Sequence, residues 1–201
     1  PQGSMETEVT AWENIVACSR PAKREPEVWV AGMDFARTTD FVAVVLFGLA
    51  GDEWVWQQHT WVCSQCKDLS RIKFPIQDAV ERGLITWVED VEIPPELPAK
   101  WLSEQMATKR VIGVAIDDYR FGIMKKALEG VGFVAGKDGN ILQVKGRNIM
   151  QIAPRLIAKL NRQQVAFGDD ALMRWYINNT KQLLDTRGNI TFGKIEPKTR
   201  K

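Results

Sequence analysis

Two apolar stretches of the sequence each lead into aspartate, and these carboxylates are the groups best suited to chemistry. Asp34 interrupts the apolar run 28–35, and Asp117 with Asp118 ends the apolar run 111–116. A carboxylate beside a buried strand is costly unless it is paired, hydrogen-bonded or bound to a metal ion. Strands that bring acids to one sheet edge could hold one or two Mg²⁺ ions about 4 Å apart. Such ions would activate water and stabilise the leaving oxygen of a phosphodiester.

The same acids also have a structural explanation, which stays open at this stage. Asp34 could cap a turn at the end of its strand. Asp117 or Asp118 could cap the helix that follows, as aspartate often does. Acids at the ends of two separate strands indicate a metal site more strongly than either acid does by itself.

The composition leaves carboxylates as the expected metal ligands. The chain has one histidine, His59, and three cysteines, so multi-histidine sites are excluded and a histidine-based triad is not expected. Cys63 and Cys66 form a Cys-x-x-Cys pair, but structural zinc needs about four ligands and no second pair occurs. We therefore predict two ordinary thiols. Few cysteines without a secretion signal indicate a reducing, intracellular compartment.

A nucleic-acid surface would have to come from local clustering, because the net charge is only +2. The segment 145–162 has five basic residues and no acid. Arg155, Lys159 and Arg162 fall on one helical face, opposite an expected apolar stripe. This face is interpreted either as a solvated surface or as a phosphate-binding one. No apolar run approaches the length of a membrane span, so no membrane contact is expected.

The apolar pattern also predicts the elements that must position these residues. Three strands joined by short turns predict an antiparallel meander over 28–35, 41–49 and 54–62. A fourth core strand over 111–116 follows intervening helices, which predicts the α/β class with a central sheet covered by helices. The other expected elements are helices over 76–82, 94–108, 121–129, 148–161 and 170–178, a short strand over 84–88, and a hairpin over 182–192.

Several of these stretches together resemble the nuclease half of phage large terminases. The first is Gly32-Met33-Asp34-Phe35-Ala36-Arg37-Thr38-Thr39-Asp40, and the second is Ala115-Ile116-Asp117-Asp118-Tyr119. Segments 12–18, 59–61 and 178–190 resemble the family's interdomain linker, third strand and closing hairpin, so the resemblance runs from about Trp12 to Lys201. It implies a ribonuclease-H-like mixed sheet, an antiparallel three-strand meander plus parallel strands, flanked by helices.

The resemblance also implies roles for particular acids. Asp34 and Asp117 correspond to catalytic ligands of Mg²⁺ or Mn²⁺, in a site for two ions. Asp118 is the alternative to Asp117, and Asp40 is expected to fix the loop or support the ligands. The family's third acidic ligand follows the closing hairpin in a Lys-x-Asp-Gly-like segment, which the sequence lacks. Glu196 stands too early to replace it, so this ligand is expected beyond Lys201.

A division of the chain follows from the same resemblance. Residues 1–27 are expected to be a cloning remnant, Pro1–Ser4, and a linker from an ATPase domain, whose phosphate-binding loop is missing. Residues 28–201 are expected to be the nuclease domain, truncated at its C-terminal end. We expect this fragment to fold but to cleave DNA poorly. Extension by about 30 residues, estimated from typical element sizes, should restore Mn²⁺-dependent nicking of a plasmid.

The function implied is that of an endonuclease in a viral genome-packaging motor. It would cut concatemeric double-stranded DNA by two-metal phosphodiester hydrolysis, in the host cell cytoplasm during virus assembly. The small terminase subunit and the portal protein are the implied partners. Two alternatives stay open: another ribonuclease-H-like nuclease of resolvase or transposase type, and a catalytically inactive fragment that only binds DNA.

Overall fold

The chain folds into two compact units in a computed structural model that describes residues 6–36 and 41–195. The first unit draws on residues 1–23, 52–54 and 145–201, and the second on residues 24–51 and 55–144. Asp34 and Asp117 both belong to the second unit, whereas Arg155, Lys159 and Arg162 belong to the first. Among the described residues, we find no helix with the length and apolar character needed to cross a bilayer.

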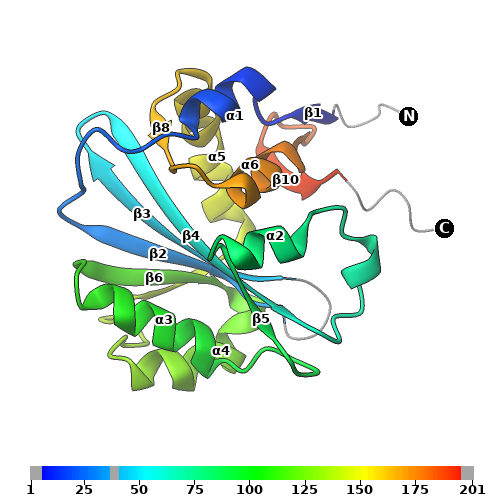
Figure 1. The fold of residues 1–201 in the computed structure, drawn as a ribbon. Helices are drawn as coiled ribbons and strands as arrows, with labels where there is room; N and C mark the ends of the chain where they lie inside the picture. The colour runs from blue at the N-terminus through cyan, green and yellow to red at the C-terminus, as the bar shows by residue number, and fades with distance from the viewer. Residues whose placement is uncertain (1–5, 37–40, 196–201) are drawn as a thin grey trace. The chain divides into compact units, whose positions relative to one another are not determined.

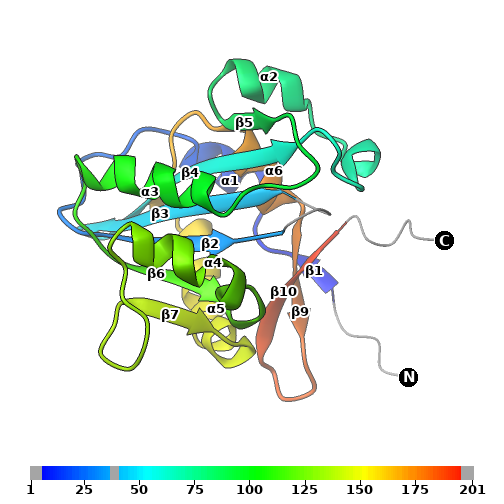
Figure 2. The same ribbon diagram turned by 90° about the horizontal axis from the view of Figure 1, so that it is seen from below.

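The second unit is built on a mixed sheet with the strand order β5-β4-β3-β2-β6-β7 (Figures 1 and 2). Strand β2 is antiparallel to β3 and parallel to β6, while β4 is parallel to β5 and β6 is parallel to β7. This arrangement confirms the predicted ribonuclease-H-like combination of a meander with parallel strands. The strand bounds are β2 (Trp29–Asp34), β3 (Val42–Ala50), β4 (Glu53–Cys63), β5 (Ile85–Val88), β6 (Val111–Asp117) and β7 (Ile141–Val144).

Two helices of this unit, α3 (Glu96–Met106) and α4 (Asp118–Gly130), lie along the same face of the sheet (Figure 2). Leu102 of α3 and Leu128 of α4 are fully buried, and helix α4 contacts β6 and β7. The strands alternate accordingly: Trp29, Ala31 and Met33 are buried. The helix-covered face is therefore the core of the unit. A single-turn helix η1 (Leu69–Arg71) and helix α2 (Ile76–Glu81) precede β5.

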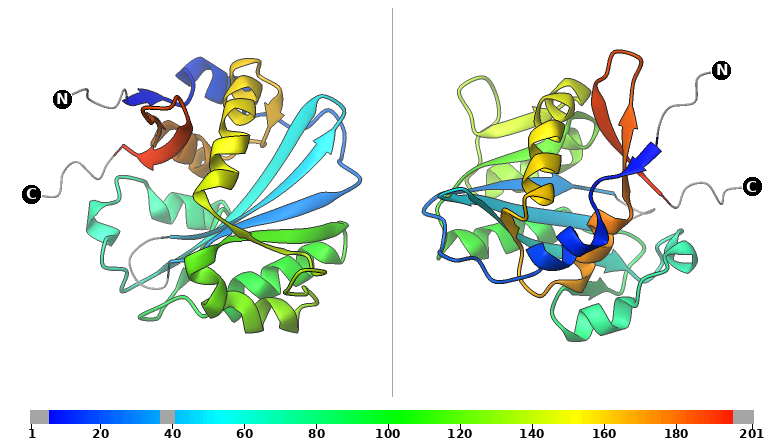
Figure 3. Two further views of the ribbon diagram at one scale, coloured as in Figure 1. Left: turned by 180° about the vertical axis from the view of Figure 1, so that it is seen from behind. Right: turned by 90° about the horizontal axis from the view of Figure 1, so that it is seen from above.

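The first unit combines helices with a small antiparallel sheet in the order β1-β9-β10 (Figure 3). Helix α5 contacts β10, and helix α1 contacts both α5 and α6. The first residues of β4 also belong to this unit, where Trp54 N donates to Gln164 O at 2.9 Å. The bounds are β1 (Glu6–Glu8), α1 (Trp12–Cys18), α5 (Gly146–Asn161), β8 (Val165–Ala166), α6 (Ala171–Asn178), β9 (Thr180–Leu184) and β10 (Ile190–Lys194).

The predicted elements are confirmed with shifts of a few residues, whereas strands β1, β7 and β8 were not predicted. Strand β1 lies in the part of the chain that was expected to be a linker, and it pairs with β9. In α1, Ile15 lies in the core, whereas Trp12 is 51% exposed. In α5, Ile152 is 44% exposed although the apolar pattern places it in the buried stripe. The stripe is centred on Ala153 and Leu160, which share a face seven residues apart.

Candidate active site

Asp34 and Asp117 stand at the ends of neighbouring parallel strands. Met33 of β2 pairs with Ile116 of β6, so Asp34 and Asp117 are the next residues along the two strands. Paired positions on parallel strands project to the same face of a sheet, and the two carboxylates therefore stand side by side at its carboxyl edge. The register brings together the two acids that the sequence singled out, and both are exposed.

The position of Asp34 follows from the alternation of β2. Ala31 and Met33 point to the helix-covered core, so the next residue, Asp34, points to the opposite face. Asp34 can thus keep its charge hydrated at the end of an apolar strand. This removes the cost that would attend a carboxylate in the core.

Asp117 is the N-cap of α4, which is the structural role considered for it from the sequence. Its Oδ1 accepts a hydrogen bond from Tyr119 N at 2.8 Å. A carboxylate offers about four lone-pair positions, so one such bond leaves capacity for an ion and also fixes the carboxylate's orientation. Asp118 is already the first residue of α4 and is exposed. Asp118 therefore lies in the helix and not on the strand that ends at Asp117.

The donors present suit a hard, partly hydrated cation. Among residues 6–36 and 41–195, no three His, Cys, Asp or Glu side chains gather closely enough to hold a metal ion. Mg²⁺ commonly keeps several waters and binds through one or two carboxylates. Asp34 and Asp117 therefore fit such an ion as a pair. Asp40 and Glu196, the other acids considered from the sequence, lie outside the described residues.

Asp185, another acid near the closing hairpin, is committed to the hairpin turn within the first unit. It accepts hydrogen bonds from Asn189 Nδ2 at 3.0 Å, from Asn189 N at 2.9 Å and from Arg187 N at 2.8 Å. These bonds, from Asn189 above all, hold the pKa of Asp185 below its usual range. The carboxylate thus stabilises the turn between β9 and β10.

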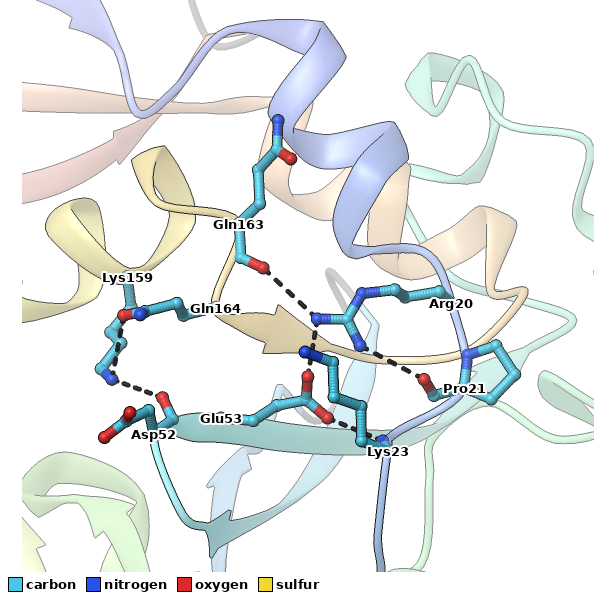
Figure 4. A network of polar contacts seen from close by, with 8 residues as sticks. All are labelled: Arg20, Pro21, Lys23, Asp52, Glu53, Lys159, Gln163 and Gln164. Atoms are coloured by element: carbon cyan, nitrogen blue, oxygen red, sulfur yellow. Dashed lines mark hydrogen bonds and ion pairs between the residues drawn. The ribbon is translucent and has the colours of Figure 1, made fainter.

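The predicted basic face of α5 divides into two kinds of residue. Arg155 and Arg162 are exposed on the same side of the helix. Lys159 between them is half-buried, and its Nζ donates to the Asp52 carbonyl and to Gln164 Oε1, the latter at 3.2 Å (Figure 4). It also lies 5.9 Å from the centre of the Trp54 ring. Lys159 therefore has a structural role within the first unit.

A buried ion pair in the first unit was not expected from the sequence. Glu53 is only 8% exposed, and its carboxylate binds Arg20 Nη2 at 2.6 Å and Lys23 N at 2.9 Å (Figure 4). Arg20 also donates to Gln163 O at 3.3 Å. Burial acts to raise the pKa of Glu53, but the Arg20 and Lys23 contacts outweigh it and the pKa is lowered. The sequence offered one sign of this ion pair, because Glu53 is an acid at the start of the apolar strand β4.

His59 and the Cys63–Cys66 pair, which were also considered from the sequence, lie within the packed part of the second unit. His59 Nε2 lies 2.7 Å from Thr86 Oγ1, and its ring stacks on that of Trp101 with 5.7 Å between the ring centroids, so this strand residue has a polar and an aromatic partner. Burial lowers the pKa of His59. Cys63 and Cys66 are both buried, and burial raises the pKa of the Cys63 thiol.

A cavity of about 530 Å³ lies at the end of the sheet away from Asp34, where β2 begins and β3 ends. Val30, Leu49 and Ile112 are among its lining residues. Val30 precedes Asp34 by four residues, or about 13 Å along an extended strand. The cavity is therefore separate from the two aspartates, which stand in the open at the carboxyl edge.

Comparison with known proteins gives structural but no sequence matches. No family model and no curated protein matches the chain. The large terminase of bacteriophage HK97 superposes with a TM-score of 0.80 at 17% identity, over 94% of this chain and 40% of that one. The large terminase nuclease of thermophilic phage G20c with bound magnesium gives 0.52 at 15% identity, over 98% and 91%. The large terminase of thermophilic bacteriophage D6E with ATP-gamma-S gives 0.52 at 12% identity, over 87% and 38%.

At these identities the likeness establishes the fold. The chain has the ribonuclease-H-like fold found in the nuclease domains of phage large terminases. It spans 40% of the length of the HK97 protein and 38% of that of the D6E protein.

Proposed function

We propose that the chain is the nuclease domain of a viral DNA-packaging motor and cuts concatemeric double-stranded DNA. The observation that carries the proposal is the juxtaposition of Asp34 and Asp117 on paired strands of this fold. Structures of the G20c terminase nuclease contain magnesium in one case and cobalt in another, which supports the use of a divalent ion. In the longer protein, the small terminase subunit and the portal protein would be partners, in the host cell cytoplasm.

The residues of this chain would act by holding ions and orienting DNA. Asp34 and Asp117 would bind Mg²⁺ or Mn²⁺, in a site for two ions, with Asp118 as the alternative second ligand and Asp40 in support. When bound, these ions would activate water for attack on phosphorus and stabilise the leaving oxygen. The bond from Tyr119 N keeps one oxygen of Asp117 fixed, so that the carboxylate is oriented before the ion arrives.

The test is cleavage of supercoiled and linear DNA in Mn²⁺, with the 201-residue chain and with a longer one that carries the flanking sequence. We expect the longer chain to nick and linearise DNA in a reaction that EDTA stops, and the 201-residue chain to cleave much less. A chain that binds DNA but never cuts it, in either length, would favour the inactive DNA-binding alternative. Preferential cutting of four-way junctions would favour the resolvase alternative.

We also propose that Arg155 and Arg162 contact DNA phosphates. Replacing both with alanine should weaken binding to every DNA sequence alike and reduce the slope of log K against log salt by about 2, or about 0.9 per lost contact. Fluorescence anisotropy over a salt series measures both effects. Lys159 is left intact because its loss would also break the contacts with Asp52 and Gln164.

The matched control is the double variant Arg82→Ala with Lys100→Ala, which removes one exposed charge at the end of α2 and one within α3. It should leave the salt slope unchanged. If the Arg155 and Arg162 variant binds as well as the control does, this face of α5 is plain solvent-exposed surface.

A further inference from the structure

We infer that the outer face of α4 is a track for a DNA strand that reaches the two aspartates around the carboxyl end of the sheet. The aspartates project from the sheet face opposite α4, but the helix begins directly after Asp117, at that end. The track consists of Tyr119, Gly122 and Lys126, and the inference rests on the nuclease function proposed above. These residues are spaced i, i+3 and i+7, which places them on one face of the helix. From Tyr119 to Lys126 the helix rises about 10.5 Å, or about three nucleotide steps at 3.4 Å each.

Tyr119 is the first observation. Its side chain is 91% exposed, although most aromatic residues of the chain are buried or half-buried. Its backbone N donates to Asp117 Oδ1, so the backbone of Tyr119 is held directly beside the proposed metal ligand. An exposed aromatic ring gives a base or sugar a surface to stack on, whichever the DNA sequence.

Gly122 is the second observation. It lies inside the helix, one turn after Tyr119, and a Cβ placed on it would meet no atom within 4 Å. Glycine is unfavourable in a helix interior relative to alanine, and no packing against a neighbour requires it here. An absent side chain between the aromatic and the basic residue leaves the helix surface flat, which lets a DNA backbone come close.

The charges on α4 are the third observation. The helix has three exposed basic residues, Arg120, Lys125 and Lys126, against the two acids Asp118 and Glu129. Among the described residues, neither Lys125 nor Lys126 forms an ion pair. Lys126 can therefore bind a phosphate, and the charge of Asp118 lies at the end of the helix where a cation is proposed. A polyanion fits this face better than an acidic or apolar partner does.

The test introduces a carboxylate into the track without disturbing the fold. Gly122→Glu adds negative charge at an open position and replaces a poor helix former with a good one. Ser103→Glu, at an exposed position of α3, is the control with the same change of charge. DNA affinity is measured by fluorescence anisotropy in Ca²⁺, so that binding is observed without cleavage. The melting temperature Tm shows whether each variant is folded. We expect Gly122→Glu to weaken binding about tenfold, and Ser103→Glu to change it less than twofold.

Single variants separate the two contacts. Lys126→Ala should reduce the salt slope by about 1, as expected for one lost phosphate. Tyr119→Leu should weaken binding about fivefold or more, whereas Tyr119→Phe should restore it, because stacking needs only the ring. Each variant should also raise KM for cleavage more than it lowers kcat, in whichever chain length cuts DNA.

The outcomes distinguish this inference from the function on which it rests. If the unmodified chain binds and cuts DNA, but Gly122→Glu binds as the Ser103→Glu control does, the track is wrong and the nuclease proposal stands. If the unmodified chain neither binds nor cuts DNA, both are overturned. Equal weakening by Tyr119→Phe and Tyr119→Leu would reject stacking and with it the role given to Tyr119.

Discussion

Asp117→Asn is expected to abolish DNA cleavage while the fold stays intact. Asparagine caps a helix about as well as aspartate does, so the contact with Tyr119 N can persist. The loss of the negative charge, however, lowers the affinity of the site for a divalent ion. Metal ions contribute several kcal/mol to the transition state, and about 4 kcal/mol corresponds to a roughly 10³-fold loss of rate. The measurement is single-turnover cleavage of DNA in Mn²⁺ by whichever chain length cuts DNA, with Tm as the check on the fold.

Asp34→Asn should have the same effect, because Asp34 occupies the equivalent end of the paired strand. Mn²⁺ should raise the Tm of the unmodified protein and not that of either variant, since an ion that binds only the folded state stabilises it. Asp118→Asn is the control, because this residue is also exposed and directly follows Asp117. If Asp118→Asn loses cleavage while Asp117→Asn retains it, the ligand at the end of β6 has been misassigned.

Glu53→Ala should be the most destabilising of the polar substitutions considered. It removes the carboxylate that the Arg20 guanidinium and Lys23 N bind, in a part-buried position, and leaves Arg20 only carbonyl acceptors. Removing one partner of a buried ion pair costs about 3–5 kcal/mol. Because the Arg20 side chain remains 31% exposed, we expect about 2–3 kcal/mol, measured as the free energy of unfolding in urea. Asp52→Ala, at the exposed neighbour, should cost less than about 0.5 kcal/mol.

The contribution of Glu53 should depend on pH with a defined sign. Its folded-state pKa is lowered from the ordinary value of 4.5, so the folded state favours the ionised form. The stabilisation is fully present above the unfolded pKa and is lost as the pH falls through the folded pKa. The difference in unfolding free energy between the unmodified protein and Glu53→Gln should therefore shrink below about pH 4.5. A difference that stays constant from pH 7 to pH 3 would contradict an ionised Glu53.

The sequence alone predicted the elements that carry the candidate site. The strand that ends at Asp34 and the strand that ends at Asp117 were visible as local apolar runs, and the closing hairpin as a turn between short strands. Local periodicity reports burial and turns within about ten residues. These features are set by neighbours along the chain, so the structure confirms them with shifts of a residue or two. The resemblance in the two acidic stretches then predicted the class of fold.

Which residues meet was decided by the tertiary structure. Met33 and Ile116, 83 positions apart, pair only because β6 enters the sheet beside β2 in one particular register. The slip of register between Trp29 and Ala31 has no signature in the local pattern. The same holds for Lys159, which the helical spacing placed with Arg155 and Arg162 but which contacts Asp52 and Gln164. Periodicity assigns a side chain to a face, whereas its partners come from distant segments whose approach depends on the packing of the whole unit.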